Sequence, residues 1–314
     1  MSILVTGANG FVGKLLVSDL LKKQYDVVGV LRSQHDNQAD VKMAAIGEIT
    51  AVTDWSTALN AIDVIVHLAA RVHVMNDQAS DPLAEFRKVN VDGTLNLARQ
   101  AVKAGVRRFI FVSSIKVNGE LTQVDKPFAA SDIPCPQDAY GISKYEAEQG
   151  LLKLAKETGL EVVIIRPPLI YGGGVKANFA SMMKAVKRGF PLPLGAINNK
   201  RSFVYVGNLI SLILKCIDHP SAANQVFLVS DGHDLSTTEL LKVCAQSLDV
   251  SPRLLPVPQR FLEVAAKILG KESLAQRLCG NLQVDITKTC QLLDWEPQFS
   301  VEDGLKDVAV ALHS

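Results

Sequence analysis

The sequence predicts an α/β fold in which a doubly wound parallel sheet is followed by a smaller mixed domain. Over the first 170 residues, short apolar runs alternate with segments of helical spacing, which is the order of a parallel sheet covered on both faces. A glycine-rich turn follows the first apolar run directly. The chain has 314 residues, enough for about two domains of ~150 residues each.

The alternation begins at the first residues. The run 3–6 is apolar and ends in glycine, as a buried strand does, and residues 11–23 carry Phe11, Leu15 and Leu20 at helical spacing. The strands expected along the chain are 3–6, 27–31, 49–52, 63–67, 108–112 and 162–166. The helices expected in this half are 11–23, about 82–104 and about 140–157.

The pattern changes after Pro167 and Pro168, where glycines and prolines interrupt the chain more often. We assign residues 1–170 to the main domain, with return segments from about 203–230, and 171–314 mainly to a smaller substrate-binding domain. Helices are expected there at 207–217 and 236–248, and an apolar run at 226–229. Residues 254–270 have helical apolar spacing and are expected to pack inside this domain.

Composition excludes several classes of protein. Lys and Arg number 33 and Asp and Glu 32, so the net charge of +1 argues against a nucleic-acid partner. No apolar stretch approaches the ~20 residues of a membrane span, so no membrane partner is expected. The five cysteines are scattered without a CxxC pair, which indicates no metal site and fits a reducing compartment. Without a basic and apolar leader at the N-terminus, we expect a cytoplasmic protein.

The glycine-rich turn predicts a dinucleotide site. Gly7, Gly10 and Gly13 stand between the first strand and the first helix, where backbone N–H groups approach a pyrophosphate at the helix N-terminus. The spacing is GxxGxxG, and the context of strand, turn and helix is that of a Rossmann-type sheet. The residues of this loop expected to bind the cofactor are Gly7, Asn9, Gly10, Phe11, Val12 and Gly13.

The end of the second strand bears on the choice of cofactor. An NAD site places a carboxylate there to bind the ribose 2′-hydroxyl, but this chain has Leu31-Arg32-Ser33. Arg32 is able to pair with a 2′-phosphate, so NADP(H) is favoured and NAD(H) remains possible. The alternative is that Arg32 is a solvated cation. Asp54, after the third expected strand, is a candidate ligand of the adenine amino group or a cap before Trp55.

A catalytic set is expected at the carboxyl edge of the sheet. Tyr140 and Lys144 are spaced i and i+4, so they share one helix face, and the cation favours the phenolate form of the tyrosine. Ser114 ends the fifth strand, where open α/β sheets bind ligands. The small residues that follow the fourth strand would let a flat ring approach the backbone, and they are Leu68, Ala69 and Ala70.

With these residues the chain resembles the NAD-dependent epimerase/dehydratase family of extended short-chain dehydrogenases/reductases. The resemblance implies that Tyr140 is the general acid/base, that Lys144 is its partner and a ribose ligand, and that Ser114 bonds the reacting oxygen. Asn90, in Val89-Asn90-Val91, would be structural or contact the cofactor, and Pro167, in Arg166-Pro167, would lie beside it. The family also implies a homodimer through the two long helices.

The same resemblance points to a nucleotide-sugar substrate. Asn178 and Arg201 stand where nucleotide-sugar members contact the diphosphate, although a helix cap and a surface cation are the alternatives. Two departures lie near Ser114: Asn118 replaces a frequent tyrosine, and Lys116 replaces a small hydroxyl residue.

The C-terminal part resembles a reductase branch of the family. Sugar 4-epimerases carry an arginine a few residues before the Asp-x-(Ser/Thr)-Lys element, but here Arg277 is eight residues before Asp285. This form is similar to UDP-2-acetamido-2,6-dideoxy-hexulose 4-reductases of O-antigen and capsule synthesis. The stretch 70–75 is also similar to that branch, and its His73 is either a sugar contact or a loop residue.

The expected function is therefore NADPH-dependent reduction of the 4-keto group of a UDP-4-keto-6-deoxy-hexosamine. The nearest alternative is an NAD-dependent UDP-sugar 4-epimerase, which uses the same residues without net redox change. A dehydratase would need an additional acid/base pair beside Ser114, which Lys116 and Val117 do not supply. An alternative of another class is a non-catalytic NADP-binding sensor, which retention of both Tyr140 and Lys144 disfavours.

Overall fold

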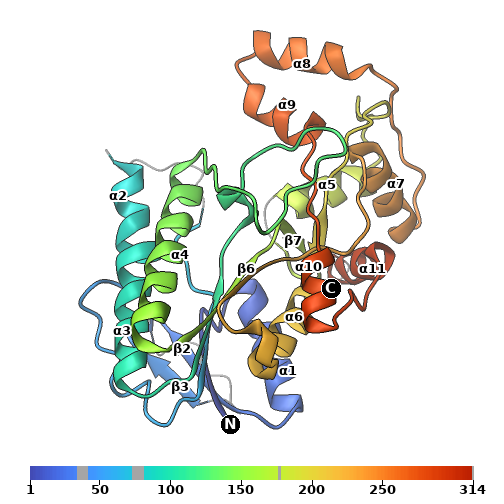
Figure 1. Ribbon diagram of the computed structural model, residues 1–314. Helices are drawn as coiled ribbons and strands as arrows, with labels where there is room; N and C mark the ends of the chain where they lie inside the picture. Colours follow the sequence, from blue (N-terminus) through green and yellow to red (C-terminus); the bar gives the residue numbers. More distant parts are fainter. Residues whose placement is uncertain (34–41, 73–80, 176–177, 313–314) are drawn as a thin grey trace.

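A computed structural model describes residues 1–33, 42–72, 81–175 and 178–312 (Figure 1). Its main sheet has seven strands in the order β3-β2-β1-β4-β5-β6-β9, and all neighbouring pairs run parallel. The strands are β1 (Ser2–Thr6), β2 (Asp26–Leu31), β3 (Lys42–Ala45), β4 (Val64–His67), β5 (Arg108–Val112), β6 (Glu161–Arg166) and β9 (Gln225–Leu228). The order turns outward from β1 in both directions, so the expected doubly wound α/β fold is confirmed.

Helices cover both faces of this sheet, as continuous apolar strands require. One face carries α2 (Pro82–Arg87), α3 (Thr94–Lys103) and α4 (Ala139–Thr158) side by side (Figure 1). The other face carries α1 (Phe11–Lys22) and α6 (Val206–Asp218). The helix expected over 82–104 is a continuous helical run in which residues Lys88–Gly93 form a π-helical turn, η1.

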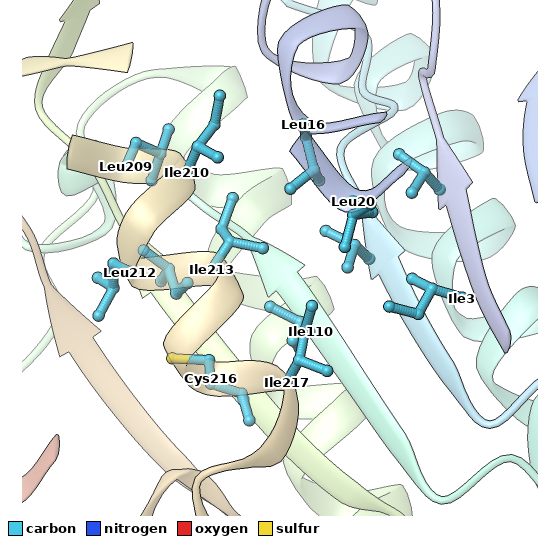
Figure 2. Close-up of a cluster of buried hydrophobic side chains, with 14 of the residues drawn as sticks. Ile3, Leu16, Leu20, Ile110, Leu209, Ile210, Leu212, Ile213, Cys216 and Ile217 are labelled. Atoms are coloured by element: carbon cyan, nitrogen blue, oxygen red, sulfur yellow. The ribbon is translucent and has the colours of Figure 1, made fainter. Parts of the chain in front are cut away.

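The side chains of β1 divide between the two faces because successive residues of a strand point in opposite directions. Ile3 and Val5 belong to a core shared with α1 and α6. Figure 2 shows this core, where Leu16 and Leu20 of α1 lie opposite Ile213 of α6. Leu4 joins the second core on the opposite face, together with buried side chains of α3 and α4.

The third strand lies earlier than the sequence predicts. Residues 49–52 form a turn, with Val52 89% exposed, and β3 pairs with β2 in their place. The backbone of this turn finds its partners on α3: Asn96 Nδ2 donates to the carbonyls of Thr50 and Thr53 at 3.1 and 2.8 Å. These bonds satisfy carbonyl groups that a neighbouring strand would otherwise bind, so the backbone here is paired without joining the sheet.

The second half builds a further layer. Strands β7 (Leu169–Tyr171) and β8 (Phe203–Tyr205) form a separate parallel pair. A third core packs α5 (Asn178–Lys187), α7 (Thr237–Ser247) and α11 (Val301–Ala311) together. The further elements of this half are η3 (Pro220–Ala222), α8 (Gln259–Ile268), α9 (Glu272–Cys279) and α10 (Thr287–Leu293), while the short helix η2 (Ile115–Val117) follows β5 in the first half.

Two expectations for this half have different outcomes. Within 203–230, β9 joins the main sheet and α6 packs against it, while the division into two domains at residue 170, with its return segments, stays a prediction. The expectation that 254–270 packs inside the domain is wrong for α8, because none of its residues is buried. No helix in the described part of the chain is both long and apolar enough to cross a bilayer.

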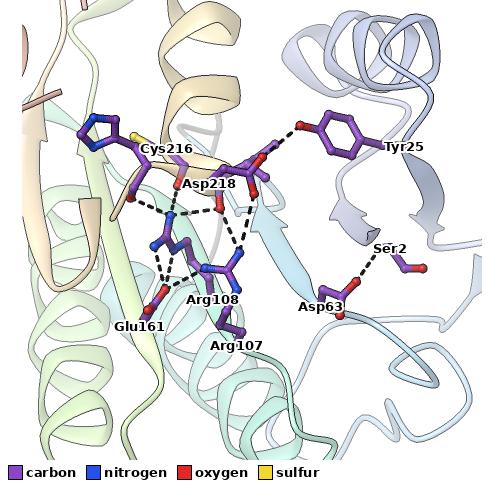
Figure 3. A network of polar contacts seen from close by, with 10 residues as sticks. Ser2, Tyr25, Asp63, Arg107, Arg108, Glu161, Cys216 and Asp218 are labelled. Carbon is purple, nitrogen blue, oxygen red and sulfur yellow. Dashed lines mark hydrogen bonds and ion pairs between the residues drawn. The ribbon is translucent and has the colours of Figure 1, made fainter. Parts of the chain in front are cut away.

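The buried guanidinium of Arg108 joins the middle of the sheet to the segment 203–230 (Figure 3). Arg108, at the start of β5, is 1% exposed. Its Nη1 donates to the carbonyls of Cys216, Ile217 and His219 at 2.6, 3.0 and 3.0 Å, and its Nε donates to Glu161 Oε2 at 2.8 Å. Arg108 thus binds three carbonyls at the C-terminal end of α6, one of which, that of Ile217, also accepts from Arg107 at 3.2 Å.

Replacing Arg108 with methionine should lower the free energy of unfolding by about 3 kcal/mol, because carbonyls and a carboxylate lose a buried partner. The matched control is Arg107→Met, since Arg107 pairs with the same Glu161 but is 43% exposed. That change should cost less than about 1 kcal/mol. Urea denaturation of both variants measures the difference, and equal destabilisation would contradict the role assigned to Arg108.

Candidate active site

The pairing register gathers the ends of the central strands at one edge of the sheet. Thr6 of β1 pairs with His67 of β4, and His67 pairs with Phe111 of β5. The segments that follow these strands carry the glycine turn, residues 68–70 and Ser114. In open α/β sheets this carboxyl edge is where ligands bind.

The glycine turn has the shape that a dinucleotide pyrophosphate needs. Gly7 has φ +68°, and a Cβ placed on it would lie 3.0 Å from the backbone nitrogen of Ala69. A Cβ on Gly13 would lie 2.1 Å from the Gly7 carbonyl oxygen. The helix α1 begins at Phe11 with no side-chain cap and no acidic residue in its first turn. Its N-terminal N–H groups are therefore suited to an anion, and these residues fit the pyrophosphate of NAD(P).

A buried histidine shapes the neighbouring segment, Leu68–Ala70. Thr6 Oγ1 accepts bonds from the nitrogens of Leu68 and Ala69, each at 3.1 Å, so its own hydrogen is directed at His67 Nδ1, 2.7 Å away. The Nε2 atom of His67 then carries the ring proton and donates to Thr94 Oγ1 at 2.9 Å. Burial, with the nearby charge of Lys144, lowers the pKa of His67 to about 3, so the ring is neutral.

Asn90 lies in the π-helical turn η1 and holds neighbouring backbone in place. Its side chain accepts from the nitrogen of Arg71 at 2.8 Å and donates to the carbonyl of Arg71 and to Ser143 Oγ, both at 3.0 Å. Asn90 is 1% exposed. Of the two roles expected for it, this geometry favours the structural one, because it connects α4 with the segment after β4.

Ser114 and Tyr140 come together at this edge. Burial, followed by the charge of Asp138, raises the pKa of Tyr140 above its ordinary value, and the hydrogen bond between its hydroxyl and Ser114 opposes that shift. Pro167 contributes through its carbonyl, which accepts from the nitrogen of Ile115 at 2.9 Å and so fixes the turn that holds Ser114. A serine–phenol pair of this kind is able to hold an oxygen and exchange a proton with it.

Lys144 lies one turn beyond Tyr140 on α4 and is buried. Its Nζ donates to the carbonyl of Val112 at 2.9 Å and lies 4.3 Å from the centre of the Phe111 ring. Burial lowers the pKa of Lys144 to about 7, and the charge of Glu148 opposes that shift. Glu148 is fully buried one turn further along α4 and pairs with Arg166 of β6.

Asn118 and Lys116, the two residues near Ser114 that depart from the family's pattern, each form polar contacts. Asn118 accepts from Arg166 Nη1 at 2.9 Å, which completes the buried network beneath Lys144. Lys116 forms an ion pair with Asp138, the residue that caps α4 by accepting from Gly141 N at 2.7 Å. A Cβ on Gly141 would lie 2.9 Å from the Lys116 carbonyl oxygen, so α4 begins in direct contact with the Ser114 turn.

The residues expected to select the cofactor lie apart from this cluster. Arg32 is exposed just after β2. Asp54 is also exposed, and its Oδ1 accepts from the nitrogen of Ser56 at 2.9 Å, which lowers its pKa. This bond is the capping alternative for Asp54, formed here over a turn.

The expected diphosphate ligands are placed in the second half of the chain. Arg201 is half-buried, and its Nη1 donates to the carbonyl of Gly280 at 2.9 Å. Burial lowers the pKa of Arg201, and in the described residues no carboxylate pairs with it, so its charge is suited to an anion. Asn178 is the first residue of α5, but its side chain lies outside the description, as does His73.

Sequence reasoning missed the polar residues that support this site. Thr6, Thr94 and Glu148 carry no motif of their own, although Glu148 follows Lys144 at i+4 on the same helix face. That spacing is the one signal from which a buried partner could have been inferred. The described residues contain no group of three or more His, Cys, Asp or Glu side chains suited to a metal ion.

The fold and site together define an enzyme class. The sequence pattern of the NAD dependent epimerase/dehydratase family matches residues 3–230, so the chain belongs to that family. It is an NAD(P)-dependent enzyme of the extended short-chain dehydrogenase/reductase type, as its motifs predict.

Particular relatives narrow the comparison further. The chain is 51% identical over 312 residues to a UDP-glucose 4-epimerase of Vibrio cholerae, which covers 99% of this chain and 95% of the relative. It is 29% identical over 302 residues to the N-acetyl-alpha-D-glucosaminyl-diphospho-ditrans,octacis-undecaprenol 4-epimerase of Escherichia coli O157:H7, covering 91% and 88%. The crystal structure of a Thermotoga maritima UDP-glucose 4-epimerase with UDP-glucose has a TM-score of 0.79 at 26% identity, covering 100% and 99%.

The charge of Asp138 gives a testable effect on Tyr140. Asparagine also caps helices, so Asp138→Asn should keep α4 intact while it removes a carboxylate that raises the tyrosine pKa. The remaining Lys116 cation acts in the same direction, so the pKa of Tyr140 should fall by roughly half to one unit. Ultraviolet titration of the phenolate, with Tyr140→Phe subtracted, measures the shift.

The control is Asp132→Asn, which changes a carboxylate on the same connecting segment that caps another turn. It should leave the titration unchanged. An unchanged or raised pKa in the Asp138 variant would show that this carboxylate does not act on Tyr140.

Proposed function

We propose that this protein is a UDP-sugar 4-epimerase that retains NAD(H) through its catalytic cycle. The observation that carries the proposal is the 51% identity to a UDP-glucose 4-epimerase over nearly the whole chain. The paired Ser114 and Tyr140, with Lys144 below them, are the residues that such a reaction needs. These comparisons favour the epimerase over the reductase that the C-terminal motif led us to expect.

Tyr140, Ser114 and Lys144 have separate roles in the reaction at C4 of the sugar. NAD, when bound, would supply the hydride acceptor and donor for the C4 carbon. Tyr140 takes the proton from the 4-hydroxyl and later returns it, while Ser114 holds the oxygen by a hydrogen bond. Lys144, whose pKa of about 7 leaves it partly protonated at neutral pH, stabilises the phenolate from one turn away.

The substrate's diphosphate is assigned to the second half of the chain. Arg201 offers a planar cation bonded only to the neutral Gly280 carbonyl among the described residues. Asn178, the first residue of α5, is the second proposed diphosphate ligand. A homodimer through the two long helices, the run from α2 to α3 and α4, which lie side by side on one face of the sheet, is part of the same proposal.

The variant Tyr140→Phe tests the acid/base assignment. It removes only the hydroxyl, so interconversion of UDP-glucose and UDP-galactose should slow by about 10²–10⁴-fold while bound NAD(H) is retained. The control is Tyr145→Phe on the same helix, which should keep the wild-type rate. Product ratios measured by chromatography without added cofactor report the reaction, and full activity in Tyr140→Phe would exclude this role.

A 4-keto reductase remains the second candidate because of one observation. The end of β2 carries the exposed Arg32 and no carboxylate, which favours a 2′-phosphate and hence NADPH as a consumed substrate. Stoichiometric NADPH oxidation with a UDP-4-keto-6-deoxy-hexosamine, and no interconversion of UDP-hexoses, would support this candidate and exclude the epimerase.

Arg32→Ala separates the two cofactors directly. If Arg32 binds the 2′-phosphate, the Kd for NADPH should rise roughly ten- to hundredfold while the Kd for NADH stays unchanged. Arg99→Ala, which removes an exposed cation on α3, should change neither Kd. Nicotinamide fluorescence titrations measure both constants, and equal changes for the two cofactors would assign Arg32 no part in the selection.

A further inference from the structure

The helical hairpin of α8 and α9 forms an outer edge of the molecule, farthest from the main sheet (Figure 1). The two helices contact each other, but no residue of α8 is buried and Cys279 is the one buried residue of α9. An apolar helix face normally packs on a core. On α8 such a face has no cover within the described chain.

Two apolar stripes run along α8, and only one of them is covered. Leu262 and Ala266, spaced i and i+4, are half-buried and mark the side that meets α9. Phe261, Val264 and Ile268, spaced i, i+3 and i+7, form the second stripe and are 69%, 58% and 80% exposed. This second stripe is the outer face of the hairpin.

Positive charge borders the exposed stripe. Arg260 directly precedes Phe261 and Lys267 directly precedes Ile268, and at 3.6 residues per turn both cations fall on the same side of the stripe, away from α9. Both are exposed, and neither forms an ion pair within the described residues. Glu263 lies further round the helix and accepts a bond from Gln259 at 2.8 Å. The cations therefore line the apolar face, and the acid stands away from it.

We propose that the outer face of α8 docks on an anionic membrane surface, a peripheral contact that departs from the expectation of no membrane partner, which rested on the lack of a spanning stretch. A short helix with an aromatic apolar face and cations along its edge lies in the plane of the lipid headgroups, with its apolar side chains at the acyl boundary. Lys and Arg stems lie along that boundary while their charges reach lipid phosphates. The helix is too short to cross a bilayer, and its place at the outer edge lets it meet a flat surface.

The base of the α8–α9 hairpin adjoins Arg201, the residue expected to bind the substrate's diphosphate. Gln259 Nε2 donates to the carbonyl of Cys279 at 3.4 Å, and the next carbonyl, that of Gly280, accepts from Arg201. Docking would therefore hold the part of the second half that contains Arg201 toward the membrane. This consequence rests on the proposed role of Arg201, whereas docking itself rests only on α8.

Vesicle co-sedimentation of the full chain tests the proposal. The wild-type protein should bind vesicles of phosphatidylcholine with phosphatidylglycerol, and bind vesicles of phosphatidylcholine alone far more weakly. The double change Phe261→Ser and Ile268→Ser should weaken binding to the mixed vesicles at least about tenfold. Arg260→Gln with Lys267→Gln should reduce binding and its salt dependence.

The matched control is Val52→Ser with Ile133→Ser, since both residues are 89% exposed and lie far from the hairpin in the sequence. It should bind vesicles like the wild type. Activity on soluble UDP-sugar should be unchanged in all of these variants, which separates loss of docking from failure of the proposed function. The proposal is overturned if the wild type does not bind mixed vesicles, or if the serine pair on α8 binds as well as the wild type. A change of oligomeric state in the α8 variant without a change in vesicle binding would assign the face to a second copy.

Discussion

The parallel register of the central strands is the constraint on which the rest of the site depends. Thr6, His67, Phe111 and Ile164 stand opposite one another across β1, β4, β5 and β6. Because these strands run in the same direction, their following segments all leave at one edge. At this edge the Gly7 turn approaches the backbone of Ala69 so closely that a Cβ on Gly7 would lie 3.0 Å from the Ala69 nitrogen. Every group of the candidate active site is then placed relative to that edge.

Burial of charge sets the chemical character of the site. Lys144 loses water on all sides and its pKa falls to about 7, yet Glu148 stands one turn away and limits that fall. Glu148 is itself paired with Arg166, which also binds Asn118. Lys144 thus donates its hydrogen bond to the Val112 carbonyl, while the buried Glu148 of this network acts on it through charge. Such a network holds its members rigidly only when each of them is satisfied.

Much of the fold and part of the site could be predicted from local patterns. The strand at 3–6, the glycine turn and the i, i+4 spacing of Tyr140 and Lys144 are local features, and the structure has each at its expected place. The apolar run 49–52 wrongly predicts a strand, because the backbone of this turn is bonded by Asn96, which lies more than forty residues away in the chain. The apolar spacing of α8 wrongly predicts that the helix packs inside the domain, because periodicity shows that a helix has an apolar side but not whether another element covers it.

The sequence by itself determined the fold class, and it predicts the cofactor turn and the reacting side chains. These follow from short-range periodicity and from residue types whose chemistry does not depend on distant contacts. Only the tertiary structure decided that Thr6 and Thr94 set the tautomer of His67, that Asn90 serves the backbone, and that Arg108 holds the end of α6. Each of these roles joins residues distant in the chain, and a hydrogen bond or a buried charge depends on where the partner lies in space.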